Sequence, residues 1–121
     1  MKTRELKGAA LDWAVALANG LEFDESNEPI WFGDDDEPYY EAVRIPYRPS
    51  INWAQGGPII EREELYVQPT GDAAKWKAYL RLTDVVRFSK EHYGPTPLIA
   101  AMRCYVASKF GDEIEIPKEL V

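Results

Sequence analysis

The residues best suited to bind a ligand gather in one block near the middle of the chain, between positions 47 and 63. The block contains aromatic residues, two arginines and the run Gly56-Gly57-Pro58. Glycine lets another chain segment or a ligand approach the backbone closely, and proline favours the first position of a helix. The sequence therefore predicts a short middle helix that begins at Pro58, with Gly57 as its N-cap.

A helix start offers free backbone N–H groups and a positive dipole end, which together suit a phosphate or carboxylate. Because Pro58 has no N–H group, we expect the amides of Ile59 and Ile60 to face the anion. A base or sugar would stack on an aromatic ring beside them. The alternative is a purely structural turn, with its tryptophan in the core. The expected ligand-binding residues are Tyr47, Arg48, Trp53, Gly56, Gly57 and Arg62.

No catalytic or metal-binding signature accompanies this block. His92 and Cys104 are the single histidine and cysteine. We expect His92 at the surface in a loop and Cys104 packed inside a helix, where a cysteine behaves as a small apolar residue. Four consecutive acids, 34–37, lack the alternate spacing of a calcium loop. We expect no metal, no cofactor and no enzymatic activity, although a small carboxylate-dependent enzyme stays open because the fold sets carboxylate separations.

Length and composition are typical of one soluble domain that spans residues 1–121. A single cysteine excludes an internal disulfide and fits a reducing cytoplasm. No apolar run approaches the roughly 18 residues that a membrane helix requires. We therefore expect a cytoplasmic protein without membrane association.

The negative charge is concentrated in one part of the chain. The formal net charge is -7, and residues 21–43 contain nine acids and no lysine or arginine. Residues 21–38 are expected to form an acidic loop, which either keeps the protein soluble or docks a basic partner. The second possibility makes an acidic protein–protein inhibitor the alternative functional hypothesis. No cluster of basic residues exists, so we expect no direct nucleic-acid binding.

The pattern along the chain predicts an α+β fold, in which a small antiparallel sheet packs with two main helices and the short middle helix. The main helices are expected at 8–19, ended by Gly20, and at 97–110, capped by Thr96 and ended by Gly111. The expected strands lie at 30–32, 39–45, 65–67, 76–82, 84–89 and 114–116.

The first of these helices is apolar almost all round, since only Asp12 and Asn19 are polar after Gly8. Such a helix is covered on more than one side. A single small domain has limited means to cover two helix faces, so we expect a homodimer.

Three blocks in this order resemble the NinX-like family of phage proteins: 8–16, 49–63 with its Trp-Ala-Gln-Gly-Gly-Pro core, and 96–111. The resemblance implies a small accessory protein of temperate enterobacterial phages or prophages, at work in the host cytoplasm. The family is a domain of unknown function and assigns no catalytic residues. The leading hypothesis is a non-enzymatic protein that binds a small anionic or nucleotide-like ligand and so counters a host defence. The alternative partner is a host protein.

Overall fold

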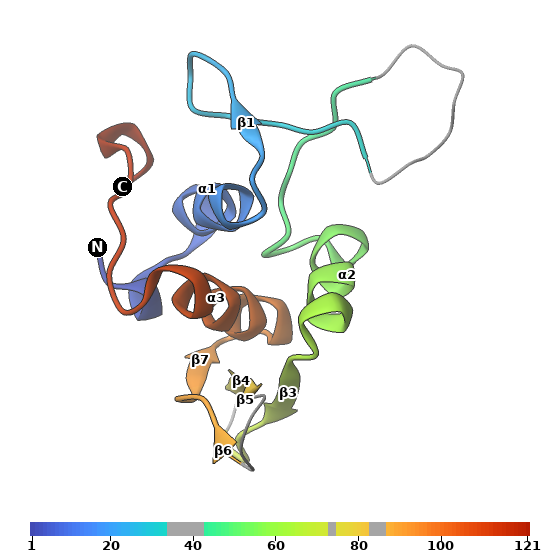
Figure 1. Ribbon diagram of the computed structural model, residues 1–121, viewed down its shortest axis with the longest axis vertical. Coiled ribbons are helices and arrows are strands. Elements are labelled where there is room, and N and C mark those ends of the chain that lie inside the picture. The colour runs from blue at the N-terminus through green and yellow to red at the C-terminus, as the bar shows by residue number, and fades with distance from the viewer. Residues whose placement is uncertain (34–42, 73–74, 83–86) are drawn as a thin grey trace.

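The C-terminal helix α3 (Pro97–Phe110) lies at the centre of the fold, between the other helices and the main sheet (Figure 1). The computed structural model describes residues 1–33, 43–72, 75–82 and 87–121. Thr96 caps α3 as expected, because its hydroxyl accepts a hydrogen bond from the Ile99 amide at 3.1 Å. Gly111 ends the helix with a φ of +82°. Seven side chains of α3 are buried on several sides, so α3 contributes much of the core.

The N-terminal helix α1 (Gly8–Ala18) packs against α3, and Leu11, Ala14 and Val15 are fully buried. On another side, Trp13 stacks on Phe23 with ring centroids 5.3 Å apart. These contacts cover much of α1 within one chain and weaken the reason for expecting a partner subunit, although Leu17 is 37% exposed. The homodimer itself stays a prediction.

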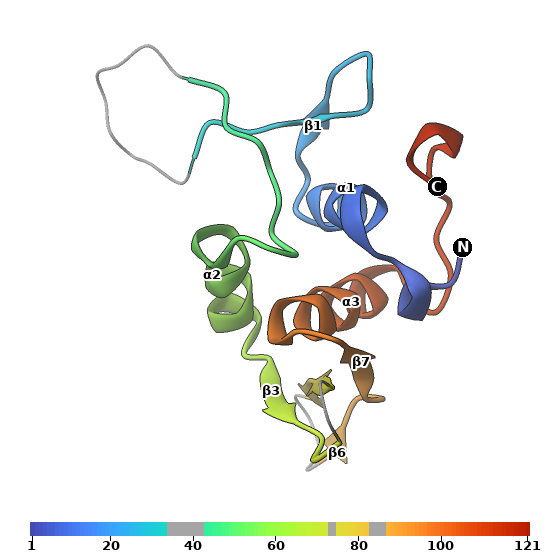
Figure 2. The same cartoon turned by 180° about the vertical axis from the view of Figure 1, so that it is seen from behind.

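The strands form three separate antiparallel sheets in the described parts of the chain. The main sheet has the order β3 (Tyr66–Pro69), β4 (Trp76–Tyr79) and β7 (His92–Gly94). It packs under α3 in both views (Figures 1 and 2). β5 (Arg81–Leu82) pairs with β6 (Arg87–Phe88), and β1 (Glu22–Phe23) pairs with β2 (Pro29–Ile30). The expected α+β class, with small antiparallel sheets and three helices, is confirmed.

Several predicted strands differ from the observed ones. The strand expected at 76–82 is divided at Leu80, whose amide donates to the Ser89 hydroxyl instead of continuing the ladder. No strand forms at 114–116; the nearest ladder contact is an isolated bridge between Lys2 and Glu113, just before this segment. The strand expected at 30–32 is shorter and lies at Pro29–Ile30. Positions 39–42 and 84–86 of two further predicted strands lie outside the described residues.

The middle helix α2 (Trp53–Glu63) begins five residues earlier than the sequence pattern indicates. Asn52 is its N-cap, because the Asn52 side chain accepts a hydrogen bond from the Ala54 amide at 2.9 Å. The prediction of Gly57 as N-cap and Pro58 as first residue is therefore wrong. Asparagine is a stronger N-cap than glycine, and Pro58 is tolerated inside the helix.

The two ends of the chain run side by side near the end of α3 (Figure 2). The Thr3 amide donates to the Asp112 carbonyl at 2.9 Å, and the Ile114 amide donates to the Met1 carbonyl. A short 3-10 helix, η1 (Thr3–Glu5), follows directly, and a second one, η2 (Lys118–Leu120), closes the chain. Among the described residues, no helix has both the length and the apolarity that crossing a bilayer demands.

Candidate functional site

The expected anion cradle at Gly56-Gly57-Pro58 is not a helix start in the structure. Ile59 and Ile60 lie inside α2, where backbone amides bond to carbonyls one turn earlier. The true helix start is occupied as well, because the Asn52 carbonyl accepts hydrogen bonds from the Gln55 and Gly56 amides at 3.0 and 2.8 Å. This segment therefore does not present the free amides from which the anion site was predicted.

The two glycines of α2 have different roles. A side chain at Gly56 would collide with the Pro49 carbonyl oxygen and lie 2.6 Å from Leu98 Cδ2. Gly56 thus allows the 47–52 segment and α3 to approach the helix closely. Gly57 has no such contact, since its nearest neighbour would be Trp53 Cε3 at 3.8 Å. The sequence correctly suggested close approach to this block, but the approaching group is the protein's own backbone.

Two of the predicted residues line a cavity of about 190 Å³ between α1, α2 and the loops before α2. Tyr47 is buried and its hydroxyl accepts a hydrogen bond from Asn19 at 2.7 Å. Arg62 donates to the Asn19 side-chain oxygen at 2.8 Å and to the Tyr105 hydroxyl at 3.1 Å. Its Nε donates to Glu63 at 2.8 Å. These bonds join three helices and occupy much of the guanidinium.

The other predicted residues do not face this cavity. Trp53 is 57% exposed at the start of α2, so the alternative of a core tryptophan does not hold. Arg48 lies 3.5 Å from the Glu28 carboxylate, and its amide donates to the Gln55 side chain. The six predicted residues therefore lie near one another in sequence without converging on one hollow.

Part of the acidic segment is neutralised within the chain. Asp24 forms an ion pair with Arg44 at 2.6 Å. The hydrogen bond from the Glu28 amide, followed by the contact with Arg44, lowers the pKa of the Asp24 carboxyl. The four consecutive acids at 34–37 lie outside the described residues.

A second hollow, larger than the cavity beside Arg62, lies between η1, β7 and α3, and we call it the η1–β7 pocket. It has a volume of about 850 Å³ and includes Thr3, Lys90, His92, Gly94, Arg103 and Asp112 among its lining residues. Gly94 is required here because a Cβ atom would lie 2.7 Å from the Ala100 amide nitrogen. Because Gly94 has no Cβ atom, β7 can lie directly against the first turns of α3.

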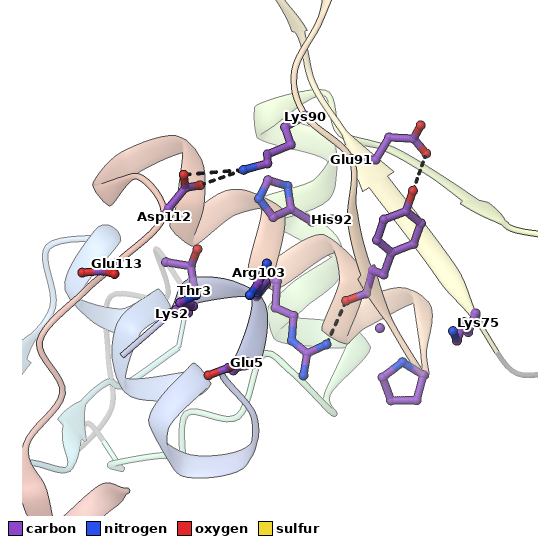
Figure 3. A pocket seen from close by; sticks show the side chains of 14 residues that line it. Lys2, Thr3, Glu5, Lys75, Lys90, Glu91, His92, Arg103, Asp112 and Glu113 are labelled. Atoms are coloured by element: carbon purple, nitrogen blue, oxygen red, sulfur yellow. Dashed lines mark hydrogen bonds and ion pairs between the residues drawn. The ribbon is translucent and has the colours of Figure 1, made fainter.

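Arg103 extends from α3 to both other walls of the pocket. Its Nε donates to the Leu6 carbonyl, which follows η1, and one terminal nitrogen donates to the Tyr93 carbonyl, both at 2.8 Å. Figure 3 shows the second of these bonds as a dashed line from Arg103. No carboxylate in the described ranges lies within 4.0 Å of this guanidinium. Burial lowers the pKa of Arg103, which nevertheless stays charged at neutral pH. An oriented positive charge with only neutral partners is suited to bind an anion.

His92 corrects a second prediction, because it is a strand residue with 8% exposure and not a surface loop residue. Its ring projects from β7 toward the side where Thr3 and Asp112 lie (Figure 3). Burial lowers the pKa of the imidazole, and the Lys90 ammonium acts in the same direction. A backbone hydrogen bond with Lys90 and the Asp112 carboxylate oppose this effect. Nδ1 is covered and has no hydrogen-bond partner in the structure as described.

Cys104 behaves as expected. Cys104 follows Arg103 on α3 and is 1% exposed, and burial raises the pKa of its thiol to about 11. A thiol with this pKa is protonated at neutral pH and is a poor nucleophile.

The comparison with known proteins identifies the family. The sequence matches the model described as Bacteriophage P22, NinX, over residues 2–109. The chain belongs to this family. The match extends over all three helices and the main sheet, and it confirms the resemblance carried by the three sequence blocks.

Among solved structures, this NinX-family chain is similar to a phage protein from Bacillus cereus ATCC 14579, known from a crystal structure. The TM-score is 0.54 at 19% identity, and the alignment covers 89% of this chain and 87% of the other. At that identity the likeness shows a shared fold and nothing about activity. No curated protein matches the chain.

The larger of these two hollows in the NinX-family chain thus lies away from the predicted block. Nothing in the local sequence around Arg103 or His92 marks them as site residues, because η1, β7 and α3 meet only in the folded chain. The sequence indicated this pocket only indirectly. Thr96 and Pro97 predict the start of α3, and Gly94 lies just before them.

Proposed function

We propose that this protein is a non-enzymatic phage accessory protein that binds a small anionic ligand in the η1–β7 pocket. The observation that carries the proposal is Arg103, held between two backbone carbonyls without a carboxylate partner among the described residues. A guanidinium fixed in this way keeps further N–H groups for a ligand and needs little reorganisation to bind one.

The charge around the pocket supports an anion. Lys2, Arg4 and Lys75 line it in addition to Arg103, and none of these four cations forms an ion pair within the described chain. Lys90 is paired with Asp112 at 3.4 Å. The pocket is therefore locally basic on a protein whose formal net charge is -7.

The size of the pocket supports an organic ligand. Small-molecule sites span roughly 300–1,000 Å³, a range that includes this pocket and excludes the 190 Å³ cavity beside Arg62. A phage protein of this kind, acting in the host cytoplasm, would counter a host defence by sequestering such a ligand.

We expect replacement of Arg103 by glutamine to weaken anion binding about tenfold, the effect of losing one charge-assisted contact. Isothermal titration with inorganic phosphate, a nucleoside monophosphate and succinate measures this change. Because Arg103 also joins the Leu6 and Tyr93 carbonyls, the exposed rim residue Lys75 provides a second variant. Lys75→Gln removes a pocket charge without touching those bonds and should weaken binding severalfold.

Arg62→Gln is the matched control, since it removes an arginine from the smaller cavity and leaves the η1–β7 pocket intact. Its affinity for each anion should equal that of the unmodified protein. Loss of binding in Arg62→Gln, with Arg103→Gln and Lys75→Gln unaffected, would place the ligand at the originally predicted block. If the unmodified protein binds none of the three anions, the proposal is overturned.

A further inference from the structure

The charged residues that line the η1–β7 pocket have an excess of positive charge. Its unpaired lining cations are Lys2, Arg4, Lys75 and Arg103, and its unpaired lining acids in the described ranges are Glu5 and Glu113. Four cations against two acids leave an excess of two positive charges. A phosphate monoester carries close to two negative charges at neutral pH, whereas a single carboxylate carries one.

The pocket has room for more than an inorganic ion. At about 850 Å³ the pocket is far larger than a phosphate group, so the rest of it must hold an uncharged part of the ligand or remain filled with water. The guanidinium fork of Arg103 matches the geometry of phosphate oxygens.

His92 indicates which kind of group the uncharged part of the ligand carries. Its Nδ1 is the one pocket-lining side-chain atom, among the described residues, that is buried without a hydrogen-bond partner. An unsatisfied buried polar atom is costly and often marks a group that awaits a ligand or water. Nδ1 is covered in this state. Contact with a ligand in the pocket therefore requires the imidazole to turn about its Cβ–Cγ bond.

We infer that the ligand is a phosphate monoester of a hydroxyl-bearing small molecule, with its phosphate at Arg103 and a hydroxyl hydrogen-bonded to His92. This inference rests on the proposed function of the same pocket. Sugar phosphates and nucleotides both carry a phosphate and hydroxyl groups. The hydrogen bond to His92 would make either of them bind more tightly than inorganic phosphate.

The test compares inorganic phosphate, ribose 5-phosphate, adenosine monophosphate and succinate by isothermal titration. The proteins are the unmodified chain, His92→Phe, His92→Asn and Arg103→Gln. The unmodified protein should bind at least one of the two esters about tenfold more tightly than inorganic phosphate, which corresponds to one good hydrogen bond. His92→Phe keeps a planar ring in the buried position and should remove that preference. Its affinity for inorganic phosphate should stay within about twofold of the unmodified protein.

His92→Asn restores a polar atom close to the place of Nδ1 and should recover part of the preference for the ester. Tighter binding of ribose 5-phosphate than of the nucleotide assigns the site to sugar phosphates, and the reverse order assigns it to nucleotides. An unchanged ester preference in His92→Phe overturns the role of His92, while Arg103-dependent phosphate binding would still uphold the proposed function. Succinate binding as tight as that of the esters overturns the phosphate class. If no anion binds the unmodified protein, the inference and the proposed function fail together.

Discussion

Replacement of Gly56 by alanine is expected to destabilise the protein by about 3 kcal/mol, an overpacking effect at the upper end of the usual range. The added methyl group would overlap the Pro49 carbonyl oxygen and lie 2.6 Å from Leu98 Cδ2. The Leu98 side chain can move, but the Pro49 oxygen belongs to the backbone of a buried turn. Relief therefore requires a shift of α2 relative to the 47–52 segment.

Gly57→Ala provides the matched control, because it makes the same change one residue later in the same helix. Its methyl group would meet only Trp53 Cε3, at the ordinary contact distance of 3.8 Å. The gain in helix propensity, roughly 1 kcal/mol, is opposed by the restriction on a residue that precedes proline. We expect Gly57→Ala to stay within about 1 kcal/mol of the unmodified protein.

Urea unfolding followed by circular dichroism measures both free energies. Gly56→Ala should also lower the melting temperature by roughly 10 °C. Equal stability of the two variants would show that α2 does not approach Pro49 as closely as the structure indicates.

The second large effect is expected at Asp12, which is 3% exposed on α1 and accepts a hydrogen bond from the Ser50 amide at 2.9 Å. Replacement by alanine leaves this amide buried without its partner and removes the link between α1 and the turn before α2. We expect a loss of about 3 kcal/mol, the upper range for an unsatisfied buried donor. Urea unfolding at pH 7 measures it.

Asp12→Asn separates the hydrogen bond from the charge, because the asparagine oxygen can still accept from the Ser50 amide. Burial is the largest influence on this carboxyl and raises its pKa above the ordinary value of 3.8, although Ser50 and Arg48 act in the opposite direction. A carboxyl whose pKa is raised by folding favours the folded state most at low pH. That contribution is lost as the pH rises from about 3.8 through the pKa of the folded protein.

The stability of Asp12→Asn relative to the unmodified protein should therefore increase as the pH rises above 3.8, since asparagine does not titrate. Unfolding curves of both proteins at pH 3.5, 5 and 7 isolate this difference from the titration of other carboxyls. A relative stability that falls over the same interval would contradict the assigned cause.

The long helices were predictable because their signals are local. Thr96 and Pro97 at the start of α3 act within one turn, and the stops at Gly20 and Gly111 depend on their own positive φ angles. The α+β class follows from the same local patterns, and the family was evident from blocks that lie mainly on these helices and on α2.

The start of α2 was misjudged because two local signals compete. Proline after two glycines resembles a helix start, but Asn52 offers a side-chain cap that the glycine cannot provide. The outcome also depends on Pro49 and Leu98, which fill the space beside Gly56 and come from other parts of the chain. A pattern confined to 47–63 contains neither contact.

By itself the sequence determined the family, the two main helices and the α+β class, since these depend on neighbouring residues and composition. Only the tertiary structure decided that Gly56 faces the protein's own backbone, that His92 is buried, and that Arg103 joins η1 to β7. Leu6 and Arg103 are separated by 97 positions along the chain and meet only when the N-terminal segment packs on α3. Contacts over such separations leave no periodic trace in the sequence, because each partner looks like an ordinary residue of its own element.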